Sequence, residues 1–248
     1  MIAFLKIIIY TPLYNLLVLI LNIPYVDAGI AAIILTILVK LLLYPIAKKG
    51  VVTQLKMKES GKELAEIKEK YKDKQEQALK VMEFYKKNKI NPFGSILGII
   101  IQIPIIYSLY HIFLQSGLPT VNMTLLYDFV KAPEVSMLFL GFWDIAEKSL
   151  ILALLAAVSS YFQMHLSAQS MNSATPAPGK EDLSSMMAKQ MKYTFPVIVF
   201  FISWKISGVI ALYWFVSNLA GIAQDYIIKR SLLNSEKPQI AVNFVSKN

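Results

Sequence analysis

One lysine, Lys40, lies where a charged side chain carries a high energetic cost. It falls within the apolar run Ala28–Ala47, which is long enough to cross a bilayer and contains no other charged residue. A lysine near the centre of a transmembrane helix costs about 2.5–3.5 kcal/mol on insertion scales. Such residues face water, a protein partner or a substrate path. We therefore expect the function of this protein to depend on the surroundings of Lys40.

Two side chains that form hydrogen bonds share a helical face with Lys40. Thr36 and Tyr44 are each four residues away, a spacing that places side chains on one side of a helix. Lys40 is also about 12 Å along the helix from Lys48, and snorkelling covers only part of that distance. An unpaired cation at this depth is tolerated where its helix face lines a hydrated cavity. The sequence therefore predicts a wet, positively charged groove in the cytoplasmic half of the membrane.

Further polar residues in the apolar runs fall at a comparable depth under the topology given below. They are Gln102, Gln163 and Asn218, and Trp214 lies one turn deeper than Asn218 on the same face. The two glutamines and the asparagine have an alternative role, because polar side chains in a membrane bundle also hydrogen-bond neighbouring helices. Asp225 lies near the cytoplasmic end of the last run, so we do not assign it as the partner of Lys40.

The composition excludes several kinds of chemistry. Of 248 residues, 56% are hydrophobic and 17% are charged, which is typical of a multi-span membrane protein. The chain contains no cysteine, which excludes thiolate catalysis, and two histidines are too few for a histidine-based metal site. Paired carboxylates at catalytic spacing, a nucleophile elbow and a phosphate loop are all missing. We expect no enzyme activity, no cofactor and no metal.

Five apolar runs are long enough to span a membrane, which predicts an all-α polytopic membrane protein with a five-span helical bundle. The predicted spans are residues 28–47, 93–114, 149–169, 193–207 and 208–228. The last two form one apolar stretch that is too long for a single span and suits two spans with a tight turn near Lys205–Gly208. Residues 170–192 are expected to form a cytoplasmic loop and residues 229–248 a cytoplasmic tail, loose from Asn234 onward.

The distribution of basic residues predicts the orientation of these spans. Thirteen of the 25 Lys and Arg residues lie between Lys48 and Lys89, whereas residues 115–148 contain two lysines and four acidic residues. The positive-inside rule makes the basic segments cytoplasmic and residues 115–148 external. We therefore expect a plasma-membrane protein with an external N-terminus and a cytoplasmic C-terminus. The basic segments also suit contact with the membrane surface or a ribosome.

Two segments outside the spans are expected to be helical. Residues 1–27 suit an N-terminal interfacial helix, since Pro12 and Asn15 interrupt an apolar stretch that has neither the basic start nor the cleavage site of a signal peptide. A sixth span through residues 7–22 satisfies the charge rule as well, so this alternative stays open. Residues 48–92 suit a cytoplasmic antiparallel helical hairpin with a break near Lys72–Lys74. The hairpin is either a solvated pair whose apolar stripes pack together or a docking element.

Three stretches of the chain resemble the YidC/Oxa/Alb family of membrane protein insertases. They are IILTILVKLLLYPI, KEKYKDKQEQALKVMEFYKKNKINPFGSILGIIIQIPIIYSLY and FPVIVFFISWKISGVIALYWFVSNLAGIAQ. The resemblance implies a five-span core with a cytoplasmic hairpin and a hydrophilic groove that is open to the cytoplasm and the lipid and closed to the outside. Nascent membrane proteins would enter this groove and slide into the bilayer without ATP. Lys40 occupies the place of the family's basic residue, and Thr36, Gln163 and Trp214 match groove-lining positions.

The chain departs from the family pattern at a few positions. Lysine replaces the usual arginine at position 40, which keeps the charge but loses the five-donor fork of a guanidinium. Ser95 and Gly98 replace a common Cys and Pro, and Lys205 is outside the pattern. We expect the short form, without the large periplasmic domain and the long basic tail of some members.

The expected partners are nascent membrane proteins, the lipid bilayer and, in addition, the ribosome and the Sec translocon, with no specific nucleic-acid sequence. The alternative function is a small transporter or channel that uses Lys40 as an ion or proton site. That function predicts internal repeats or paired broken helices, which the five unequal runs do not display. A purely structural membrane subunit would leave Lys40 unexplained.

Overall fold

A computed structural model describes residues 6–91, 97–114, 118–169 and 183–245, and these residues are mostly helical. The predicted all-α class is confirmed for them. The main helices are α2 (Thr11–Leu21), α3 (Ala28–Leu42), α4 (Tyr44–Glu59), α5 (Gly61–Lys70), α6 (Lys74–Lys87), α7 (Leu97–Leu114), α8 (Leu150–Gln169), α9 (Leu183–Lys205) and α10 (Gly208–Val245). A π-helical turn, η1 (Lys6–Tyr10), precedes α2, and a 3-10 turn, η3 (Met123–Leu125), follows α7. The strands β1 (Leu138–Phe139) and β2 (Trp143–Asp144) pair antiparallel.

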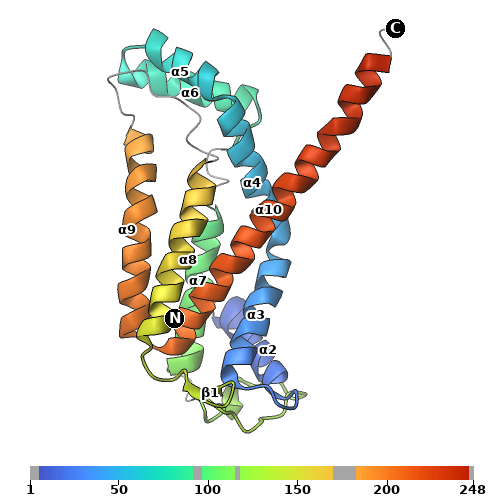
Figure 1. Ribbon diagram of the computed structural model, residues 1–248, viewed down its shortest axis with the longest axis vertical. Coiled ribbons are helices and arrows are strands. Elements are labelled where there is room, and N and C mark those ends of the chain that lie inside the picture. The colour runs from blue at the N-terminus through green and yellow to red at the C-terminus, as the bar shows by residue number, and fades with distance from the viewer. Residues whose placement is uncertain (1–5, 92–96, 115–117, 170–182, 246–248) are drawn as a thin grey trace.

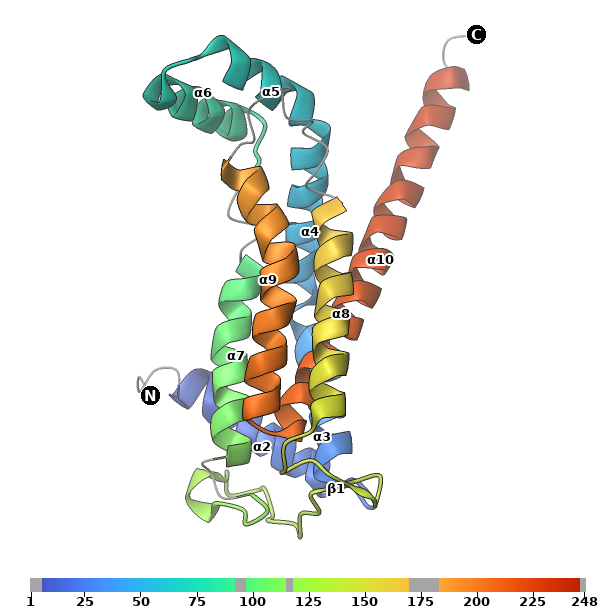
Figure 2. The same cartoon turned by 60° about the vertical axis from the view of Figure 1, so that its left-hand side comes forward.

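The long helices run side by side, and α10 crosses the bundle and projects beyond it (Figure 1). The α5–α6 pair lies at one end of the molecule, and the β1 segment lies at the opposite end with α2 (Figures 1 and 2). The main core is built from apolar side chains of α2, α3, α7, α8 and α10. Residues 170–182 of the predicted cytoplasmic loop, and Pro92–Ser95 of the NPFGS motif, lie outside the described residues.

The run 28–47 is not one straight helix. α3 ends at Leu42, α4 begins at Tyr44, and the two helices are bent by 60°. Pro45 stands in the first turn of α4, where a proline is tolerated because the amide it lacks would have no intrahelical partner. Lys40 therefore lies in the last turn of α3, just before the bend.

Taken singly, none of the described helices has both the length and the apolar composition to cross a bilayer; the bent α3–α4 pair meets this test when its two helices are combined. Shorter apolar helices cover Lys6–Leu21, Ile101–Leu114 and Leu150–Leu166. The five spans therefore stay a prediction.

α9 ends at Lys205 and α10 begins at Gly208, so the long apolar stretch is divided at the position where the sequence predicts a turn. α10 then continues to Val245, through the residues expected to form a loose tail. Helix propagation adds one hydrogen bond for each residue fixed, so a helix can extend past its packed portion without an apolar face to guide it.

α5 and α6 are joined by a short connection at residues 71–73, at the predicted break. Asp73 caps α6, because its carboxylate accepts a hydrogen bond from the Gln75 amide at 2.7 Å. The Gln77 side chain of α6 donates to the carbonyls of Lys68 and Tyr71, at 2.7 and 2.9 Å, and so ties the two helices together. Leu64 of α5, Phe84 of α6 and Ile90 form a small separate core.

Residues 118–149 cover the end of the bundle where α3 and α10 begin. The first amides of a helix have no intrahelical acceptor, and here backbone carbonyls of this segment accept their hydrogen bonds. The bonds are Ala28 to Ser136 at 2.9 Å, Gly208 to Glu147 at 2.6 Å and Val209 to Ile145 at 2.9 Å. Asp27 adds a side-chain contact, since its carboxylate accepts from the amides of Ile30 and Leu140 at 2.8 and 2.9 Å. We call residues 118–149 with their contacts to α3 and α10 the end seal.

The N-terminal helix α2 is attached to the same segment. The buried Asn15 side chain donates to the Leu125 carbonyl at 2.8 Å and accepts from the Tyr127 amide at 2.7 Å. The Tyr14 hydroxyl accepts from the Asn122 amide at 2.7 Å. α2 therefore lies at the end of the bundle that is opposite to α5 and α6.

Candidate functional site

Lys40 faces α10 at a point where that helix has no side chain. A Cβ atom placed on Gly221 would lie 3.9 Å from the Lys40 ammonium nitrogen, so the lysine approaches the α10 backbone closely. The Gln224 side chain donates a hydrogen bond to the Lys40 carbonyl at 2.7 Å. Carbonyls in the last turn of a helix lack an intrahelical donor, and Gln224 supplies one here. α10 therefore contacts the end of α3 at two points, the side chain of Lys40 and its backbone carbonyl.

One further polar side chain, that of Gln163, lies beside Lys40 at Gly221, and a second, that of Asp225, acts on the lysine through its charge. The Gln163 amide of α8 occupies the space that a Cβ on Gly221 would fill. Asp225, one turn further along α10, is an acidic residue whose charge acts on Lys40. Lys40, Gln163 and Asp225 are all half-buried. We call these three residues, with Gly221 and Gln224, the Lys40 cluster.

The sequence alone assigns no acidic partner to Lys40. The signal for Asp225 was its spacing of four from Gly221, which places both on the face of α10 that crosses the α3–α4 pair (Figure 1). Depth along the helices did not identify Asp225, because the packing of α3 against α10 cannot be placed from spacing alone.

Gln102 contacts a different part of α10. Its side-chain amide donates to the hydroxyl of Tyr213 and, at 3.4 Å, to that of Ser217. Tyr213 and Ser217 are buried and four residues apart, on one face of α10. Gln102 therefore links α7 to α10 by hydrogen bonds, which is the alternative role that its position in the sequence predicts.

Asn218 links α10 to α8. Its amide nitrogen lies 2.7 Å from the Ser160 hydroxyl, 2.9 Å from the Ser159 hydroxyl and 3.2 Å from the Ala156 carbonyl. These residues are fully or nearly fully buried. Asn218 thus forms interhelical hydrogen bonds inside the bundle.

The two remaining predicted residues are buried. Thr36 is 2% exposed, and its hydroxyl donates to the Ala32 carbonyl of its own helix at 2.6 Å. Trp214 is 7% exposed and belongs to the main core. Of the six predicted site residues, the structure brings Lys40 and Gln163 together and places the other four at separate contacts.

Substitution of Asn218 tests whether it stabilises the bundle, in contrast to Gln163, which lies beside Lys40. We expect Asn218→Ala to lower the unfolding free energy in detergent by about 1 kcal/mol, within the range for interhelical hydrogen bonds in membrane proteins. Gln163→Ala, at a half-buried position, should change it much less. Thermal unfolding of the two variants and the parent protein measures the difference. Equal destabilisation by both substitutions would contradict this contrast.

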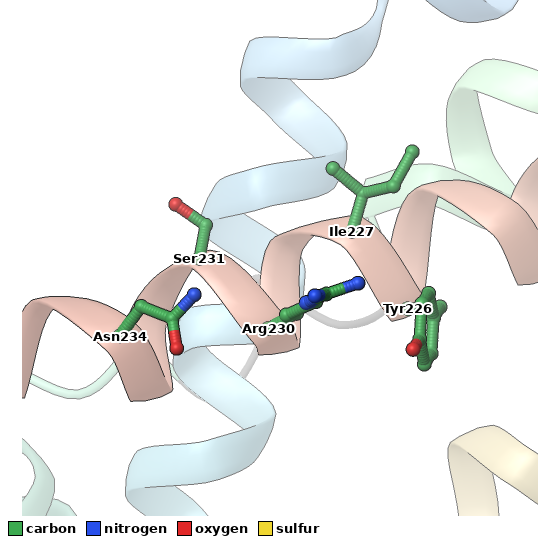
Figure 3. Close-up of a pocket in the computed structure, with 5 residues that line it drawn as sticks. All are labelled: Tyr226, Ile227, Arg230, Ser231 and Asn234. Atoms are coloured by element: carbon green, nitrogen blue, oxygen red, sulfur yellow. The ribbon is translucent and has the colours of Figure 1, made fainter.

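A hollow of about 550 Å³ lies further along α10 (Figure 3). Its lining residues are Tyr226, Ile227, Arg230, Ser231 and Asn234. All of them come from one helix, and none is among the predicted site residues. Among the residues that the structure describes, no group of three or more His, Asp or Glu side chains could hold a metal ion.

The described residues form a mostly helical bundle with a half-buried cation held between its helices. The chain belongs to the 60Kd inner membrane protein family, whose sequence profile matches residues 19–236. Family membership confirms the predicted resemblance and a location in the membrane.

Three similar proteins are all named membrane protein insertase YidC. The chain is 32% identical over 203 residues to the membrane protein insertase YidC of Fusobacterium nucleatum, which covers 82% of this chain and 86% of that protein. It is 31% identical over 206 residues to the protein of that name from Wolinella succinogenes, and 32% identical over 214 residues to the one from Pseudomonas entomophila. These alignments cover 82% and 86% of this chain but 34% of each relative. The chain therefore spans most of the Fusobacterium protein and about a third of the other two.

Proposed function

We propose that this protein is a membrane protein insertase, which moves segments of nascent membrane proteins from the cytoplasm into the bilayer without ATP. The observation that carries the proposal is the Lys40 cluster in a chain of this family: a cation held half-buried where α3, α8 and α10 meet. Relatives named for insertion supply the reaction. No catalytic step on a covalent bond is part of the proposal.

The Lys40 cluster would lower the cost of bringing a polar segment into the membrane. At an effective dielectric constant of 20, a carboxylate 4 Å from the ammonium group is attracted by about 4 kcal/mol. The Gln163 and Gln224 amides can donate to and accept from the backbone of an entering segment. The apolar span of the client would then leave sideways into the lipid, driven by removal of its apolar surface from water.

The proposed arrangement has five spans, with α5 and α6 on the cytoplasmic side and the end seal outside. The separation of the lysine-rich α5–α6 pair from the end seal, at opposite ends of the molecule, supports it. Large apolar side chains exposed on the outer surface of the bundle also support contact with lipid. They include Ile103, Leu154, Val158, Phe162, Val197 and Phe201. In this arrangement α2 is an interfacial helix at the external surface.

The α5–α6 pair would receive the client first. Its basic residues and short connection suit contact with a ribosome or with the membrane surface. We propose the Sec translocon as a further partner.

Site-specific photocross-linking tests the proposed function. A photoreactive residue at position 163 should form an adduct with a stalled nascent membrane protein, because Gln163 lies beside Lys40. The same residue at Leu154, which is 47% exposed on α8, is the matched control and should react mainly with lipid. Ion flux through liposomes without a nascent-chain adduct would favour a transporter instead. A transporter also predicts broken helices in matching positions of two repeats. The described residues contain one bent helix pair, α3–α4, without a matching second one.

A further inference from the structure

We propose that a groove between α8 and α9 binds one acyl chain of an anionic phospholipid, whose headgroup is held by Lys192. The groove has a volume of about 470 Å³, within the range of ligand pockets. Its lining residues are Leu154, Ala157, Val158, Tyr161, Phe162, Pro196, Val197 and Phe200. They offer an almost wholly apolar surface, which suits a hydrocarbon chain. This site does not depend on the insertion activity, and only its assignment to the cytoplasmic leaflet rests on the proposed topology.

A cation stands at one end of this groove. The Lys192 ammonium nitrogen lies 5.7 Å from the ring centroid of Tyr161, which also lines the groove, and 5.3 Å from that of Tyr193. Both distances are within the range of cation–π attraction. His165 stacks on Tyr161 with the ring centroids 6.0 Å apart. The aromatic rings therefore hold the lysine at the mouth of the groove.

The combination selects the class of ligand. An apolar groove matches an acyl chain. A positive point charge at the end of the groove matches the phosphate group to which that acyl chain is joined. Tyrosine and lysine are the residues that occupy the level of lipid headgroups in membrane proteins. Under the proposed topology Lys192 lies toward the cytoplasmic leaflet, where anionic lipids concentrate.

The groove is separate from the Lys40 cluster because α8 uses two different faces. Leu154, Val158 and Tyr161 follow helical spacing and line the groove with α9. Ser159, Ser160 and Gln163 instead meet α10. Phe162 and Val197 are 54% and 53% exposed, so the groove opens to the outside of the bundle. A lipid could therefore occupy it while a client is beside Lys40.

Native mass spectrometry of the full chain in detergent tests the site, with phosphatidylglycerol and phosphatidylcholine of the same acyl chains as probes. The parent protein should retain phosphatidylglycerol in preference by about fivefold, the contribution of one basic residue near an anionic headgroup. Lys192→Ala should bring the ratio to about one, and Lys192→Arg should preserve it. Lys205→Ala is the matched control, because Lys205 makes the same kind of contact, 5.7 Å from the Trp204 ring, at the other end of α9.

Val158→Trp should fill the groove and reduce binding of both lipids. Equal retention of the two lipids by the parent protein would overturn the proposal, as would an equal effect of Lys192→Ala and Lys205→Ala. A dimer that Val158→Trp dissociates would show that a second copy covers the groove, which also overturns it. A photoreactive residue at position 158 that reacts with nascent chain in place of lipid would do the same. Because lipid retention is measured without any client, failure here leaves the insertion hypothesis unaffected.

Discussion

Replacing Lys40 with alanine is expected to reduce insertion of a client with an acidic N-terminal tail to background. The substitution removes the cation at the meeting point of α3, α8 and α10. A loss of about 4 kcal/mol of attraction corresponds to roughly a thousandfold change in a transfer equilibrium. The measurement is protease protection of the client in cells that depend on the variant for insertion.

Three further variants sharpen this result. Lys40→Arg keeps the charge and should preserve insertion, whereas Lys40→Gln should not. Asp225→Asn removes an acidic group whose charge acts on Lys40 but leaves the cation, so it should not reproduce the loss. Full activity of Lys40→Ala would disprove the electrostatic mechanism without affecting the family assignment.

Substitution of Gly221 by leucine is expected to impair insertion almost as strongly as loss of the lysine. Its Cβ would occupy the space of the Gln163 amide and lie 3.9 Å from the Lys40 ammonium nitrogen. The remaining carbons of leucine would then cover the ammonium group and exclude water from it, which is costly for a charged group. The same protease-protection assay measures the effect, and thermal unfolding in detergent establishes that the variant is folded.

Smaller changes at this position separate steric from electrostatic effects. Gly221→Ala should have a partial effect, because the Gln163 amide is the end of a flexible side chain and can move. Combining it with Gln163→Ala should relieve the steric component. Ala223→Leu adds the same side chain at an exposed position of α10, and this variant should insert the client normally. Normal insertion by Gly221→Leu would mean that the space between Lys40 and Gln163 is not used by clients.

The elements that follow from local pattern were accessible to sequence reasoning. The break between α5 and α6 and the turn between α9 and α10 rest on charge and hydropathy. Depth along the spans groups Gln163 with Lys40, together with Gln102 and Asn218, and only the family resemblance singles it out. The bend after α3 had a local signal in Pro45, but a proline near a helix start does not fix the angle between two helices.

Contacts between distant segments had no such signal. The hydrogen bond from Ala28 to Ser136 joins two backbone groups, and any residue other than proline could supply that donor. The choice of Ser159 and Ser160 as acceptors for Asn218 depends on how α8 and α10 pack, which periodicity does not determine. The interhelical roles of Gln102 and Asn218 were therefore predicted only as a class, without their partners.

The end seal has an electrical consequence under the proposed topology. Moving one elementary charge across 100 mV is worth about 2.3 kcal/mol, so a continuous file of water would discharge the cell's proton gradient. At the end seal the first amides of α3 and α10 are bound to carbonyls of residues 136, 145 and 147 in place of water. Under the proposed topology these hydrogen bonds lie at the external end of the bundle, and we expect that end to stay closed to water while a client enters from the cytoplasm.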